Sequence, residues 1–161
     1  MDKITFQLEG FAEFEQQIIA LGKGYRDDLV ARQTLVKAAK KAMEVVLLEA
    51  TARAPYDSDR PATDAGKPHL KMTTRLDARI PSAKDRMSSF VNDTDAAIAV
   101  VSVKKSAVSL SQEFGNVRTQ AQPFLRIALE KNTQKVLDEL KSELSTIIPE
   151  YAKKLSRMRK K

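Results

Sequence analysis

The chain has 161 residues, of which 42% are hydrophobic and 30% charged, a balance typical of one globular domain with a sizeable core. It has no cysteine, which excludes disulfides, thiol catalysis and thiolate metal sites. The first residues lack the basic-then-apolar layout of a signal peptide, and no apolar run is long enough to suggest a membrane span. We therefore expect a soluble protein made in the cytoplasm, with no membrane partner.

The formal net charge is +7, and much of the excess lies at the C-terminus. The last eleven positions hold no acid and six basic residues, namely Lys153, Lys154, Arg157, Arg159, Lys160 and Lys161. Such an end can bind nucleic acid without sequence preference, bind an anionic protein surface, or simply be solvated. The predicted organisation is one domain over residues 1–148 and a basic helical extension over residues 149–161.

The N-terminal half is predicted to be mainly helical. Residues 4–8 alternate apolar and polar side chains like a half-buried strand, and residues 11–21 have helical spacing. A long helix is predicted from residue 27 or 28 to Arg53, ended by Pro55. Its wide apolar face consists of Leu35, Val36, Ala39, Ala42, Met43, Val46, Leu47, Ala50 and Ala54. A loop over residues 55–68 and one helical turn over residues 69–74 follow.

A small antiparallel sheet is predicted next. Residues 76–80 and 86–91 form two short strands joined around residues 81–85, and a turn at 92–95 leads to the clearest strand, 96–103. That strand is apolar on both faces, with Ile98 and Val100 on one, and Val101 and Val103 on the other. Because a strand with one face in water should alternate, we expect helices to cover one face and a neighbouring subunit the other.

Two helices complete the prediction. Residues 107–114 form a short helix ended by a left-handed Gly115, and residues 116–122 are polar and extended. Pro123 starts the last helix, which continues almost to the C-terminus with a kink or break at Pro149. At about 57 Å this helix is longer than a domain of this size, so it bends or its basic end projects towards a partner. The predicted fold class is α+β, a small, mainly antiparallel sheet packed by a long central helix and a long C-terminal helix.

Few residues are candidates for chemistry. His69 is the sole histidine, so the partners of a catalytic triad or a zinc site are missing. The carboxylate pairs Asp57/Asp59 and Asp93/Asp95 lie in turn-like segments, where aspartate commonly bonds its own backbone. A two-carboxylate hydrolase is kept as an alternative. The sequence also lacks a glycine-rich phosphate loop, and we predict no enzyme, no catalytic residue, no cofactor and no metal.

The segment 110–128 resembles the tail-completion, or head–tail joining, family of lambda-like siphophages. The residues that carry the resemblance are Glu113, Phe114 and Gly115, and then Gln122, Pro123, Phe124 and Leu125 before a long helix. The order of elements is also similar, from an N-terminal strand through a long alanine-rich helix that ends in Ala-Pro. The chain departs from the usual family pattern in the turn before Glu113 and in the short gap from Gly115 to Pro123.

The resemblance implies a structural virion protein of the tail neck, assembled in the host cytoplasm. It implies a homo-oligomeric ring, expected to be a hexamer, at the head-proximal end of the tail. Its partners would be tail-terminator or tail-tube proteins and head–tail connector proteins, with DNA nearby but not read by sequence. A tail-terminator ring protein and a small basic nucleic-acid-binding protein are the alternatives.

The motif residues have two interpretations. They fix a corner between two helices, or they contact a neighbouring subunit through Glu113 or residues 116–122. The better candidates for contact are the strand residues Ile98, Val100, Val101 and Val103, the loop after Pro55, and Tyr151 with the six C-terminal basic residues.

Overall fold

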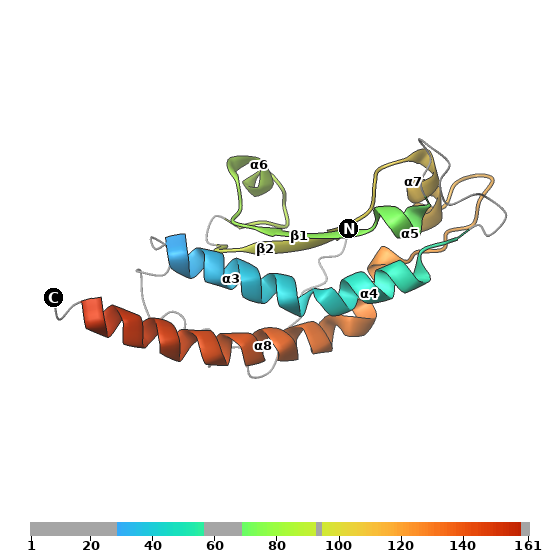
Figure 1. Cartoon of the computed structure of the whole chain (residues 1–161). Helices are drawn as coiled ribbons and strands as arrows, with labels where there is room; N and C mark the ends of the chain where they lie inside the picture. Colours follow the sequence, from blue (N-terminus) through green and yellow to red (C-terminus); the bar gives the residue numbers. More distant parts are fainter. Residues whose placement is uncertain (1–28, 57–68, 93–94, 159–161) are drawn as a thin grey trace.

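The computed structural model describes residues 29–56, 69–92 and 95–158. The strand predicted at residues 4–8, the helix predicted at 11–21 and most of the loop after Pro55 lie outside these ranges. The described chain is α+β, as predicted: a two-stranded antiparallel sheet lies on a layer of long helices (Figure 1).

The segment predicted as one long helix is helical but divided into α3 (Leu29–Ala42) and α4 (Glu44–Arg53), separated by Met43 alone. Their buried residues form a row at a spacing of four, consisting of Ala38, Ala42, Val46, Ala50 and Ala54. The predicted stripe ran through Ala39 instead, which is only half-buried. Small side chains at helical spacing allow the axes of two helices to approach closely.

The partner of this row is α8 (Leu125–Met158), which runs antiparallel to α3 and α4. Ala38 packs against Leu144 near one end, whereas Val46 and Ala50 pack against Ala128 near the other. At the surface, Lys41 of α3 forms ion pairs with Glu139 and Glu143 of α8.

Pro149 lies inside α8 without interrupting it, so of the kink or break predicted at that residue the break is wrong. The 34 residues span about 51 Å at 1.5 Å per residue. Figure 1 shows α8 as a curved helix whose last turns extend past the first turn of α3. The predicted boundary between residues 148 and 149 therefore falls within one continuous helix. None of the helices in the described residues is both long and apolar enough to cross a membrane.

The sheet consists of β1 (Arg75–Arg79) and β2 (Ile98–Ser102), paired from Arg75 with Ser102 to Arg79 with Ile98. The helical turn α5 (Leu70–Thr73) precedes β1, as predicted. The strand predicted at residues 86–91 is wrong, because this connection holds the helical turn α6 (Ala83–Arg86) followed by turns.

A capping box fixes the start of α6, within the segment predicted to join the two strands. The Ser82 hydroxyl accepts a hydrogen bond from the Asp85 backbone N–H, and the Asp85 carboxylate accepts one from the Ser82 backbone N–H. These reciprocal bonds satisfy two N–H groups that a helix start leaves without partners. Figure 1 shows α6 on the side of the sheet opposite the layer of α3, α4 and α8.

Candidate functional site

The side chain of Glu113, near the end of α7 (Ala107–Phe114), caps the N-terminus of α8. Its Oε2 accepts hydrogen bonds from the N–H groups of Phe124 (2.9 Å) and Leu125 (3.1 Å), and its Oε1 accepts one from Arg126 (3.0 Å). These N–H groups have no acceptor within their own helix. A carboxylate is also favoured at the positive end of the helix dipole. Glu113 itself is 7% exposed, so it is a structural residue of the motif.

The start of α7 holds Glu113 in place. The Ser106 hydroxyl accepts from the Ser109 N–H at 3.0 Å, and the Ser109 hydroxyl accepts from the Ser106 N–H at 2.8 Å. This second capping box fixes the first turn of a helix of only eight residues. Because Glu113 lies two turns further along the same helix, this capping box also fixes its position.

Gly115 ends α7 with φ 75° and ψ 172°. The predicted positive φ is confirmed, but the ψ value lies outside the left-handed helical region and in one almost restricted to glycine. Residues 116–119 then form a tight turn, closed by the Asn116 N–H donating to the Thr119 carbonyl at 2.9 Å. The prediction of an extended segment from 116 to 122 is therefore wrong for its first four residues.

The chain returns from this turn to the start of α8. The Gln122 N–H donates to the Gln112 carbonyl of α7 at 2.7 Å. Phe124 is 1% exposed and packs with Ala54 and Leu70. Pro123 precedes the first residue of α8 by two positions, so the prediction that it starts the helix is wrong. The first helical N–H groups belong instead to residues that Glu113 caps.

The motif therefore forms a corner between α7 and α8, which is the first of the two interpretations of the sequence. Phe114 differs from the rest of the motif, because 71% of its surface is exposed. Its side chain contributes to a surface groove beside the corner.

We call this surface the apolar groove; it has a cavity volume of about 480 Å³. Its lining comes from β2, α7, the start of α8 and the junction of α3 and α4. Four of its apolar side chains are strongly exposed, namely Phe114 (71%), Leu129 (46%), Leu110 (44%) and Val100 (43%). Lys105 and Arg126 also line it. An exposed apolar surface with a polar rim is typical of a protein-interaction site.

The strand residues proposed for contact divide between the core and this groove. Val101 packs against the cluster of Val46, Ala50 and Ala128, and Val103 packs beside Phe124. Val100 is exposed and lines the groove, and Ile98 is half-buried. The described helices thus cover the Val101 face of β2, and coverage of the other face by a neighbouring subunit stays a prediction.

The basic extension is described only in part. Tyr151, Lys153, Lys154 and Arg157 belong to the last turns of α8, and Lys153 is exposed. Arg159, Lys160 and Lys161 lie outside the described residues, as do Asp57, Asp59 and Asp93.

The remaining candidates for chemistry within the described residues, His69 and Asp95, make contacts that stabilise the fold. His69 is 2% exposed and stacks against Tyr56 at 4.4 Å between ring centroids. A carboxylate oxygen of Asp95 accepts a hydrogen bond from the Asn92 N–H at 2.9 Å. Within the described residues, no group of three or more His, Asp or Glu side chains could hold a metal ion.

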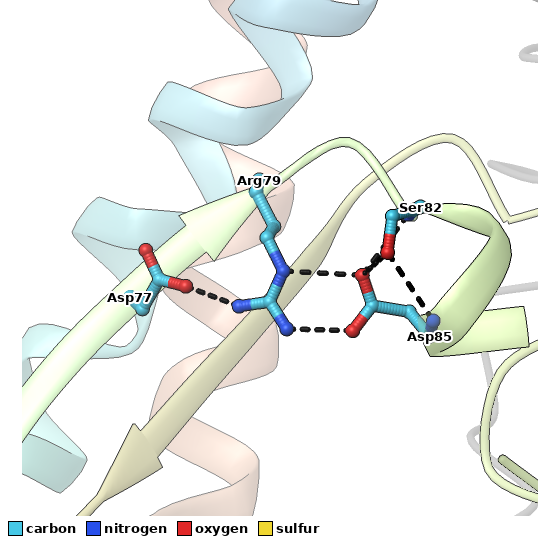
Figure 2. Close-up of polar contacts among 4 residues, drawn as sticks. All are labelled: Asp77, Arg79, Ser82 and Asp85. Carbon is cyan, nitrogen blue, oxygen red and sulfur yellow. Dashed lines mark hydrogen bonds and ion pairs between the residues drawn. The ribbon is translucent and has the colours of Figure 1, made fainter.

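An ion-pair cluster joins β1 to α6 (Figure 2). Arg79 donates from Nε to Asp85 Oδ2 (3.1 Å) and from Nη2 to Asp85 Oδ1 (2.6 Å), and its Nη1 contacts Asp77. The Ser82 hydroxyl donates to Asp85 at 2.7 Å. The Arg79 guanidinium, followed by the Ser82 hydrogen bonds, holds the pKa of Asp85 well below its usual range.

Replacing Arg79 by glutamine is expected to raise the pKa of Asp85 towards its ordinary value. Because the folded-state pKa is lowered, the contact contributes stability above the ordinary aspartate pKa and loses it as pH falls through the folded value. Titration of the Asp85 carboxyl carbon by NMR measures the change. Arg75→Gln, at the exposed other end of β1, is the control. An Asp85 titration that is the same in Arg79→Gln and the wild type would mean that the ion pair does not form in solution.

Comparisons of the chain with protein-family models, with curated proteins and with solved structures found no match.

Proposed function

We propose that the chain is a structural virion protein of the phage neck. It forms or joins a homo-oligomeric ring at the head-proximal end of the tail, completes the tail and permits head–tail joining. The observation that carries the proposal is the corner itself: the segment that resembles the neck family folds into a Glu113-capped junction that starts a 34-residue helix.

Two features of the described surface support an assembly role. The apolar groove lies directly beside the corner and exposes Leu110, Phe114 and Leu129. Burial of such side chains against another protein is favourable by about 25 cal/mol per Å² of apolar surface. The C-terminal turns of α8 extend past α3 and carry exposed Lys153, so they offer a second surface to a neighbour (Figure 1).

Deleting the gene from the phage that encodes the chain tests the proposal. The expected result in negative-stain images is filled heads and separate tails, with infectivity restored by the wild-type chain supplied from a plasmid. A deletion phage with joined particles and unchanged infectivity would remove the proposal. Tail length separates the tail-terminator alternative: loss of a terminator gives overlong tails, whereas loss of a completion protein leaves their length normal.

A small basic nucleic-acid-binding protein is the second candidate, because six basic residues lie in the last eleven positions. Binding to duplex DNA should then fall steeply with salt, because each phosphate contact releases counterions. The full chain is compared with a chain shortened to residues 1–149. Equal affinity of the two chains at low salt would exclude the extension as the DNA-binding element.

A further inference from the structure

The connection between β1 and β2 exposes two large apolar side chains. Met87 is 87% exposed and Phe90 is 90% exposed. Single apolar residues on a surface are ordinary, but these two lie within four residues of one another. We call residues 80–92, which hold both, the α6 lobe.

Polar contacts brace the α6 lobe on both sides of Met87 and Phe90. On one side, Arg79 binds Asp85, which is also the capping partner of Ser82 (Figure 2). On the other, Arg86 Nη1 donates to the Asn92 carbonyl at 2.8 Å and Nη2 to the Asp95 carbonyl at 3.4 Å. A braced segment loses little conformational freedom when it binds, so its apolar side chains are presented at low entropic cost.

The apolar groove has the complementary properties. Its exposed residues, Val100, Leu110, Phe114 and Leu129, are aliphatic or aromatic, and its volume of about 480 Å³ is of the size class that receives large side chains. Residues 87–91 of the lobe carry no charged side chain, so burial of Met87 and Phe90 in the groove removes no charge of that segment from water.

The lobe and the groove belong to opposite ends of the β1–β2 hairpin. The Arg79–Ile98 pair is adjacent to the lobe, whereas the Arg75–Ser102 end leads into α7 and the groove. Figure 1 shows α6 and α7 well separated along the sheet. A contact between two different patches of identical chains is heterologous, and repetition of it generates a closed ring or an open filament.

We propose that the α6 lobe of one copy docks through Met87 and Phe90 into the apolar groove of the next copy. The contact rests on the proposed function in one respect, since it supplies the head-to-tail interface that a neck ring requires. It assigns the lobe and the groove to the subunit interface and leaves the basic end of α8 for other partners.

Disulfide trapping in the full-length chain tests this contact, because the wild type has no cysteine. Phe90→Cys and Leu110→Cys are combined in one chain and oxidised over a range of concentrations. The expected product is a ladder of dimers, trimers and larger species. An equal mixture of the two single variants should stop at dimers, because each copy then carries one reactive end. Circular dichroism checks that the variants fold.

The matched control combines Phe90→Cys with Leu48→Cys, since Leu48 is 70% exposed on α4 but does not line the groove. This pair should stay largely monomeric. Adding Met87→Ser to the Phe90/Leu110 pair should cause loss of most of the ladder, whereas Val117→Ser, at a fully exposed loop tip, should leave it unchanged.

A Phe90/Leu110 pair that gives no ladder up to the solubility limit overturns the contact, and so does a ladder equal to that of the control pair. Both results stand whether or not the chain oligomerises through another surface. Failure of the neck function is distinguishable from failure of the contact. If a deletion phage still joins heads and tails but the ladder forms, the neck function is excluded and the contact is supported. If joining fails and no ladder forms, the neck function is supported and the contact is excluded.

Discussion

Replacing Glu113 by alanine is expected to lower the free energy of unfolding by about 3 kcal/mol. The substitution removes three charge-assisted hydrogen bonds to the N–H groups of Phe124, Leu125 and Arg126, and leaves those groups near the core without an acceptor. Loss of an ordinary helix cap costs about 1 kcal/mol, and here the buried position and the negative charge add to that loss. Urea-induced unfolding followed by circular dichroism measures the change, and the midpoint temperature should fall by about 9 °C.

Two further variants separate capping from other effects of the substitution. Glu113→Gln keeps the shape of the side chain and one acceptor oxygen, so about half of the loss is expected. Glu130→Ala removes an exposed glutamate from the same long helix and should stay within about 0.5 kcal/mol of the wild type. If Glu113→Ala behaves like Glu130→Ala, the corner does not depend on its capping carboxylate, and the structural role of the motif is wrong.

Local signals were sufficient to predict much of this fold. Apolar periodicity and Pro55 predicted the segment that forms α3 and α4, and the limits of α7 followed from its spacing and from Gly115. The missed α6 also had a local signal, because Ser82 and Asp85 stand three residues apart, as in a capping box. The sequence prediction treated residues 81–85 as a connection between two strands and overlooked this pair.

The role of Glu113 had no such local signal. Its carboxylate meets N–H groups 11 to 13 residues along the chain, and only the turn at Gly115 brings them together. The core of α8 was mispredicted for a related reason. Helical spacing predicts an apolar stripe through Leu125, Leu129 and Val136, but Ala128 and Asn132 are buried and Leu129 is 46% exposed. The alanine row of α3 and α4 packs closely against α8, so small residues of α8 fit at this contact. Asn132 can be buried there because its Nδ2 donates a hydrogen bond to the Ala128 carbonyl.

The exposed surfaces of the groove and the lobe could not be predicted from sequence either, because they depend on contacts between segments far apart in the chain. Leu110 and Phe114 were predicted to lie in a short helix, and Met87 and Phe90 in a strand. These predictions do not say which side chains are exposed, because exposure depends on neighbours in space. Their exposure becomes visible only when α7 and α6 are placed at opposite ends of the hairpin.

Replacing Gly115 by alanine is expected to cost about 3 kcal/mol of unfolding free energy, again measured by urea titration. At φ 75° and ψ 172° the backbone adopts a conformation that is strained by about 1 to 3 kcal/mol for any residue with a Cβ atom. The new Cβ would also lie 3.0 Å from the Ala121 nitrogen and 3.2 Å from the Thr119 oxygen, both backbone atoms that cannot rotate away. Val117→Ala, at the exposed tip of the same turn, should change the stability by less than about 0.5 kcal/mol.

Asparagine at position 115 distinguishes the structure from the cap predicted by sequence. In a left-handed helical cap, asparagine is the residue that best replaces glycine. The observed ψ of 172° lies outside that region, so Gly115→Asn should be as destabilising as Gly115→Ala. A near-wild-type stability for Gly115→Asn, with a large loss for Gly115→Ala, would show that the chain leaves α7 through an ordinary left-handed cap. The turn at residues 116–119 would then be directed differently, and the Glu113 carboxylate would not reach the first N–H groups of α8. Glu113→Ala and Gly115→Ala therefore test the same corner in two ways. The first removes the hydrogen-bond acceptor, and the second disrupts the turn that brings the donors to it.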